Sequence, residues 1–129
     1  DQVLAGDTCI LAGTRSQFFC SEPDAEIAGR CAAADLHPAL PLWGRGVDKL
    51  EGQAQDRRLL AIQDFQGTAG FLLAQGLTLD WRASRLVPDD FCWQFCDDGS
   101  LHLEFRLGAG SFATALLAEF VQCESFHNR

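Results

Sequence analysis

Hydrophobic and polar residues alternate with a period of two on both sides of a turn near the end of the chain, from Phe91 to Phe95 and from Leu101 to Leu107. This period is typical of strands with one buried face. A two-residue loop would put the two apolar rows on opposite faces, whereas a three-residue loop at 97–99, with glycine in the left-handed conformation, puts them on one face. The pattern therefore predicts a hairpin with one dry face, and its expected pairs are Phe95–Leu101, Trp93–Leu103 and Phe91–Phe105.

The segment after this hairpin predicts a helix. Gly108-Ala109-Gly110 ends the second strand, and Ser111 is expected to cap a helix that runs from Phe112 to Val121. Apolar side chains lie on most sides of this helix, with only a few polar residues among them. We therefore expect the helix to be covered on most sides, by more protein than this chain supplies.

The first third of the chain predicts a hairpin followed by a helix. Residues 7–12 and 17–20 are expected to be strands, joined by the turn-rich residues 13–16. Ser21 is expected to cap a helix with Pro23 in its first turn, and this helix should run to about Ala34.

The middle of the chain is less regular in its pattern. Residues 35–46 contain two prolines and two glycines, which predicts an irregular loop. Trp43 in this loop is interpreted as a packing anchor, in preference to a base-stacking residue. Residues 51–75 predict a helix that Gly67 and Gly70 could split and that Gly76 ends, and residues 77–86 predict a strand. The elements together predict an α+β fold, with a mixed or antiparallel sheet and flanking helices.

Composition indicates what kind of protein the chain comes from. The chain has 129 residues, 47% of them hydrophobic, and no methionine, so we expect it to be cut from a longer polypeptide. No apolar window is long enough to cross a membrane, which predicts a soluble, cytoplasmic protein without a membrane partner. The net charge of −8 is opposite in sign to that of most isolated nucleic-acid binders.

Cysteines are numerous, but they lie within apolar or helical stretches. Three disulfides are conceivable, although buried thiols in a reducing cytoplasm are the favoured interpretation. The six residues are Cys9, Cys20, Cys31, Cys92, Cys96 and Cys123.

Motifs that could carry chemistry are incomplete. Residues 108–113 fit the spacing of a dinucleotide-binding loop, but no strand or ribose-binding acid follows. Cys92, Cys96 and His102 lack the spacing and the second pair of ligands of a zinc site, so no metal is expected. Ser111 lacks the flanking glycines of a hydrolase nucleophile. No complete active site is predicted from these residues.

Four segments follow one another along the chain: DQVLAGDTCILAG, DLHPALPLWGRG, RLVPDDFCW and LEFRLGAGSFATALLAEFV. Their order and spacing resemble the C-terminal part of the tRNA pseudouridine synthase D (TruD) family. Ala118 and Cys92 stand where the family pattern has arginine and serine. The resemblance implies an isomerase that converts a uridine of tRNA to pseudouridine on a flipped-out nucleotide, without cofactor or metal.

The resemblance also implies how the chain is divided. Residues 1–79 would be the later part of the family's insertion domain, and residues 80–129 the closing hairpin and helix of its catalytic core. The catalytic aspartate would lie upstream, so no catalytic residue is assigned to this chain. The partners implied are tRNA, through the full-length protein, and the upstream half of the same polypeptide. Residues proposed near the active site or in contact with RNA are Gly110, Ser111, Phe112, Arg82, Arg85 and Trp43.

Two functions follow from these observations. The first is the C-terminal portion of a tRNA pseudouridine synthase, inactive as an isolated chain. The second is a non-catalytic α+β module, a degenerate relative of the enzyme, that binds a protein or an RNA–protein complex.

Overall fold

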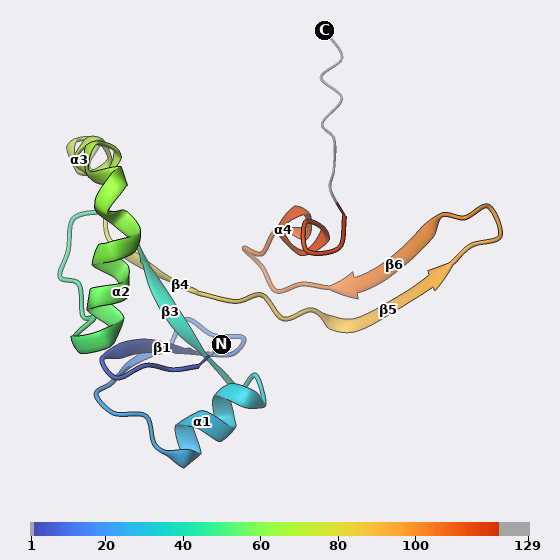
Figure 1. Ribbon diagram of the computed structural model, residues 1–129, viewed down its shortest axis with the longest axis horizontal. Helices are drawn as coiled ribbons and strands as arrows, with labels where there is room; N and C mark the ends of the chain where they lie inside the picture. Colours follow the sequence, from blue (N-terminus) through green and yellow to red (C-terminus); the bar gives the residue numbers. More distant parts are fainter. Residues whose placement is uncertain (1, 122–129) are drawn as a thin grey trace, which may run out of the picture. The chain divides into compact units, whose positions relative to one another are not determined.

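The computed structural model describes residues 2–121, and the chain divides into two units, Asp1–Arg85 and Leu86–Arg129. Each unit contains an antiparallel sheet and at least one helix (Figure 1), which confirms the predicted α+β class. The proposed division of a longer protein at residue 79 stays a prediction.

A four-stranded antiparallel sheet organises the first unit. Its strands are β1 (Asp7–Leu11), β2 (Gln17–Cys20), β3 (Leu36–Leu42) and β4 (Asp80–Ala83). Their order in the sheet is β2-β1-β3-β4, so β1 and β3 are central. The first hairpin forms as predicted, with Asp7 opposite Cys20 and Ile10 opposite Gln17.

Strand β3 corrects the prediction that residues 35–46 are irregular. Pro38 lies opposite Cys9 of β1, but its carbonyl accepts a hydrogen bond from Ser84 N at 2.8 Å, so its backbone polar groups face the β4 side. The β1 ladder therefore loses no donor at Pro38. Pro41 lies beyond the last pair with β1, which is Ala39–Thr8. Because neither proline occupies a position where β1 needs an N–H group, the sheet accepts both of them.

Helix α1 (Ala25–Ala32) contributes to the main core of this unit. Its N-cap is Asp24, whose carboxylate accepts a hydrogen bond from Ile27 N at 2.8 Å, so the prediction of Ser21 as the cap was wrong. An aspartate three residues closer to the first helical amides satisfies them directly. The buried cluster comprises Val3, Cys9, Cys20, Cys31 and Leu36, with Leu11, Phe18 and Ile27 packed against it.

The predicted helix over residues 51–75 is interrupted. Helix α2 (Gly52–Ile62) is followed by a 3-10 turn, η1 (Gln63–Phe65), and by α3 (Gln66–Ala74). The break therefore comes ahead of Gly67. Gly76, at φ +77°, donates its N–H to Leu73 O and ends α3 as predicted.

The second unit contains the predicted C-terminal hairpin. Strands β5 (Asp89–Phe95) and β6 (Leu101–Arg106) pair in the expected register, with Phe95 opposite Leu101 and Trp93 opposite Leu103. Gly99 has a φ of +83°, and Cys96 N donates to Ser100 O at 2.8 Å, which closes the three-residue loop. An irregularity between Asp89 and Cys92 removes the expected Phe91–Phe105 pairing, although these two rings still stack at 6.2 Å.

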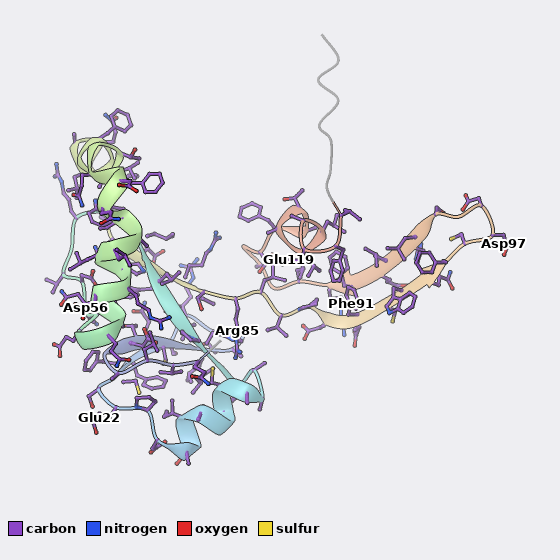
Figure 2. All side chains as sticks on the ribbon, in the orientation of Figure 1. Glu22, Asp56, Arg85, Phe91, Asp97 and Glu119 are labelled. Carbon is purple, nitrogen blue, oxygen red and sulfur yellow. The ribbon has the colours of Figure 1, made fainter. Side chains whose placement is uncertain are left out.

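The apolar face of this hairpin is not dry. Trp93 is 61% exposed and Phe95 is 72% exposed, which corrects the prediction. Apolar packing in this unit is instead concentrated around Phe91, labelled in Figure 2, whose ring stacks on Phe120 at 5.7 Å. The alternating pattern thus gives the hairpin an apolar face that a second layer must cover. The described residues of this unit contribute the packing around Phe91 and leave Trp93 and Phe95 exposed.

The last helix is shorter than predicted. Helix α4 spans Ala113–Leu117 and continues to Val121 as hydrogen-bonded turns. Its N-cap is Phe112 and no side chain caps it, so the predicted Ser111 cap is also wrong. Leu116 is buried, whereas Phe120 remains 54% exposed.

The cysteine prediction holds for the first unit. Cys9 and Cys20 are buried free thiols, and Cys31 is buried with them. Cys92 is exposed and Cys96 is half-buried, so burial was wrong for Cys92. Cys123 lies outside the described residues.

Candidate functional site

Arg85, one of the proposed RNA-contact residues, points into the first unit and contacts three neutral acceptors. Its Nε donates to Nδ1 of His37 at 2.8 Å, and one terminal nitrogen donates to Leu36 O at 2.9 Å and to Cys31 O. These acceptors belong to the C-terminal turn of α1 and to the start of β3. Figure 2 labels Arg85 just beyond β4. The guanidinium therefore joins the segment after β4 to two elements, α1 and β3.

His37 is the buried partner of this arginine, and it was not singled out from the sequence. Only 9% of the residue is exposed. Burial, and then the positive charge of Arg85, lower the pKa of His37 below its usual value. The ring is therefore neutral at neutral pH, with Nδ1 free to accept the Arg85 hydrogen bond. No local pattern could have indicated a pair that is 48 residues apart in the sequence.

Trp43, the second candidate, packs against the helices of the first unit. The guanidinium carbon of Arg58, in α2, lies 4.6 Å from the centre of its ring. Arg58 is also paired with Asp48 at 2.8 Å, and the two side chains are only 14% and 18% exposed. A small apolar cavity of about 180 Å³ lies beside the ring, lined by Trp43, Ile62, Phe65, Thr68, Ala69 and Leu72.

These contacts favour packing over base stacking as the role of Trp43. The ring is half-buried, one part of it faces Arg58, and its Nε1 is buried without a hydrogen-bond partner. A cation–π contact with a partly desolvated arginine contributes roughly 0.5 to 2 kcal/mol. The arrangement anchors residues 43–50 to α2.

The backbone beside Trp43 makes a close approach that only glycine permits. A Cβ atom on Gly44 would lie 2.2 Å from the carbonyl carbon of Thr78. Arg45 N donates to Leu77 O at 2.7 Å, and Leu79 N donates back to Arg45 O at 2.9 Å. The Pro-Leu-Trp-Gly segment is thus fixed against the chain that enters β4.

Arg82, the third candidate, is exposed on β4, an edge strand of the sheet, opposite Leu40 of β3. This location leaves its side chain accessible to solvent, in contrast to Arg85. An RNA contact by Arg82 stays a prediction.

Gly110, Ser111 and Phe112 lie in the second unit, between β6 and α4. Gly110 adopts φ +86° and thereby turns the chain into the helix, and Ser111 N donates to Gly108 O at 3.1 Å. The Phe112 side chain is 60% exposed. The turn therefore presents a hydroxyl and an aromatic ring at the start of a helix, and their role stays a prediction.

The acidic residues of the described chain form no evident catalytic pair. Asp7 is buried, and burial is the main cause that raises the pKa of its carboxyl group. However, its Oδ2 accepts a hydrogen bond from Leu4 N at 2.6 Å, so the group stabilises the turn before β1. Within residues 2–121, no three or more histidine, cysteine or acidic side chains are grouped as metal ligands would be. No described helix is long and apolar enough to cross a membrane.

Comparisons with known proteins show that this chain is similar in sequence to several curated proteins. A tRNA pseudouridine synthase D of Xanthomonas oryzae pv. oryzae is 37% identical over 121 residues, which cover 92% of this chain and 33% of that protein. The protein of the same name from Shewanella oneidensis is 38% identical over 118 residues, which are 92% of this chain and 32% of the relative. That of Aeromonas hydrophila subsp. hydrophila is 34% identical over 95% of this chain and 35% of the relative. No protein-family model matches the chain.

The chain spans about a third of the length of the curated relatives it matches. Similarity that extends across nearly all of the chain includes both units and every candidate residue region. The resemblance to the tRNA pseudouridine synthase D family is therefore confirmed for this chain.

Proposed function

We propose that this chain is the C-terminal portion of a tRNA pseudouridine synthase, which isomerises a uridine of tRNA to pseudouridine. The observation that carries the proposal is the 37% identity with such a protein over 92% of the chain but only 33% of the relative. The exposed apolar face of the β5–β6 hairpin agrees with it, because that face needs a layer that the described chain does not supply. The upstream half of the same polypeptide is the proposed source of this layer.

The reaction breaks the N1–C1′ glycosidic bond of uridine and joins C1′ of the ribose to C5 of the base, so C5 loses a proton and N1 gains one. We assign the catalytic aspartate to the upstream part of the longer protein. Asp7 is buried and its Oδ2 accepts a hydrogen bond from Leu4 N, so we assign it a structural role in the turn before β1. The chain alone is therefore expected to be inactive, and neither a cofactor nor a metal enters the proposed chemistry.

This chain is proposed to contribute to the site through its exposed candidates. Arg82 offers a guanidinium for a phosphate, and Phe112 offers a ring on which an unstacked base could lie. The net charge of −8 argues that most of the basic surface for tRNA belongs to the rest of the longer protein. Because tRNA is the proposed substrate, the proposed location is the cytoplasm.

The test is tritium release from tRNA labelled at C5 of its uridines. The protein encoded by the uninterrupted reading frame is expected to release tritium, and this chain alone is expected to release none. Supplying the upstream part as a separate polypeptide is expected to restore some release. A matched reaction with tRNA labelled at C5 of cytidine only controls for non-specific exchange.

A failure of the longer protein to release tritium from unmodified tRNA would overturn the proposal. The alternative, a non-catalytic module that binds a protein or an RNA–protein complex, would then be favoured. Release by this chain alone would also contradict the proposal, because it would place the catalytic group among the residues present here.

A further inference from the structure

The Arg85 guanidinium binds acceptors that carry no formal charge. Two are main-chain carbonyls, those of Cys31 and Leu36, and the third is the ring nitrogen of His37. The carbonyl of Cys31 lies in the last turn of α1, where the helix dipole favours a positive charge. The Cys31 carbonyl also accepts a hydrogen bond from Ala34 N at 3.1 Å, so the arginine adds a charged donor at this helix end and joins it to the start of β3.

Arg85 is also the last residue of the first unit, and Leu86 begins the second. The residue before it, Ser84, donates its N–H to Pro38 O at 2.8 Å and so prolongs the pairing of β4 with β3. Beyond Arg85 the chain contains Pro88 and enters β5 at Asp89. The side chain of Arg85 thus binds the first unit at the residue where that unit ends.

We propose that Arg85 is a positioning residue of the longer enzyme, which fixes the point where the chain leaves the first unit toward the β5–β6 hairpin. This inference rests on the proposed function. We propose it in place of an RNA contact, because Nε and one terminal nitrogen of the Arg85 guanidinium are directed at Cys31, Leu36 and His37. Small displacements of groups that support a site are sufficient to lower a rate about 100-fold.

Two variants of the longer protein, Arg85→Lys and Arg85→Gln, distinguish a positioning role of Arg85 from an RNA contact. Lysine keeps the positive charge but cannot reproduce a planar fork that reaches three acceptors. If Arg85 positions the chain, both variants lower the single-turnover rate of tritium release by about tenfold or more at saturating enzyme. The Kd for tRNA, and the slope of log Kd against log salt, should stay as in the wild type. Arg15→Gln, which removes an exposed charge in the β1–β2 turn, is the control for net charge.

An RNA contact would give the opposite pattern. Arg85→Gln would weaken tRNA binding and lower the salt slope by about one, whereas Arg85→Lys would retain most of the affinity. That pattern, or an unchanged rate in both variants, would overturn the proposal.

Amide hydrogen exchange of residues 84–87 gives a readout that does not depend on activity. Exchange there is expected to be faster in both Arg85 variants, under conditions where the amides of β1 and β6 remain protected. Unchanged exchange would overturn the positioning role. If the wild-type longer protein releases no tritium, the proposed function fails, while this exchange experiment still decides whether Arg85 holds the segment.

Discussion

Arg85 Nε donates a hydrogen bond to Nδ1 of His37 at 2.8 Å, across 48 residues of sequence. The geometry requires an imidazole with a free lone pair on Nδ1, and hence a neutral ring with its proton on Nε2. Protonation would replace this hydrogen bond by two positive charges in contact. The stability of the first unit should therefore depend on the protonation of His37.

We expect the free energy of unfolding to fall as the pH is lowered through about 6.5 toward 5. The pKa of His37 is lowered in the folded chain, so the unfolded chain binds more protons in this range. The stabilisation is thus complete above the unfolded pKa and is lost as the pH falls toward the folded pKa. Urea denaturation at a series of pH values measures it.

His37→Gln is the matched variant for this effect. The amide oxygen of glutamine can accept the Arg85 hydrogen bond but cannot be protonated in this range. We expect the variant to lose part of the pH dependence between 7.5 and 5, with a stability change at pH 7.5 of no more than about 1.5 kcal/mol. Equal pH dependence in both proteins would mean that other groups cause it.

The start of α1 offers a test of its cap. Asp24→Ala removes the acceptor of Ile27 N, and we expect it to lower the free energy of unfolding by about 0.5 to 2 kcal/mol. Ser21→Ala, at the residue that the sequence suggested, should change it by less than about 0.5 kcal/mol. Thermal melts of the two variants give the comparison, and the reverse order of effects would contradict the assignment of Asp24.

Any residue larger than glycine at position 44 is expected to lower the stability of the chain. In Gly44→Ala the added Cβ would lie 2.2 Å from the Thr78 carbonyl carbon, so the two segments must separate. We expect a loss of about 1 to 3 kcal/mol in the free energy of unfolding. Gly70→Ala is the control, because it lies in α3 with open space around it, and should stabilise the chain by about 0.5 to 1 kcal/mol. A neutral Gly44→Ala would show that residues 44 and 78 are not held together.

The features that could be predicted from sequence are those in which local signals agree. In the β5–β6 hairpin, alternation, turn residues and the left-handed Gly99 all specify one register, and the structure has it at Phe95–Leu101 and Trp93–Leu103. Strand β3 was missed because proline is normally excluded from inner strands. What admits Pro38 and Pro41 is the stagger of β1 and β4, which depends on pairing partners distant in sequence.

For the candidate residues too, contacts between residues distant in sequence could not be predicted. An RNA contact by Arg85 stays a prediction, but its hydrogen bonds to two carbonyls and to His37 could not be predicted, because these acceptors come from elements far from it in the chain. Caps were misplaced for a related reason: Ser21 and Ser111 both have suitable chemistry, but backbone geometry put the helix starts later, at Asp24 and Phe112. Sequence patterns identify residue types that suit a role, while geometry decides which residue performs it.

Trp43 is expected to behave as a packing residue. Trp43→Ala would remove the ring that contacts Arg58 and lines the small cavity beside α3, and we expect a loss of about 2 to 4 kcal/mol in stability. Trp43→Phe keeps a ring and removes an Nε1 that has no partner, so it should cost about half as much or less. Urea denaturation distinguishes the two. An unchanged melting temperature in Trp43→Ala, together with weaker binding of a partner, would instead identify a contact surface.

Phe112 is the residue of this chain for which we expect the largest effect on RNA with the smallest effect on folding. Its ring is 60% exposed in the turn between β6 and α4, and a base stacked on an aromatic ring is stabilised by about 1 to 3 kcal/mol. In the longer protein, Phe112→Ala should therefore weaken tRNA binding or slow tritium release by roughly 5- to 150-fold, while the melting temperature stays within about 2 °C. Phe71→Ala is the matched control, because Phe71 is 61% exposed on α3 and is not one of the residues proposed to contact RNA. If Phe112→Ala lowers the melting temperature strongly and leaves binding and rate unchanged, the ring is part of the core of the longer protein and not of its RNA site.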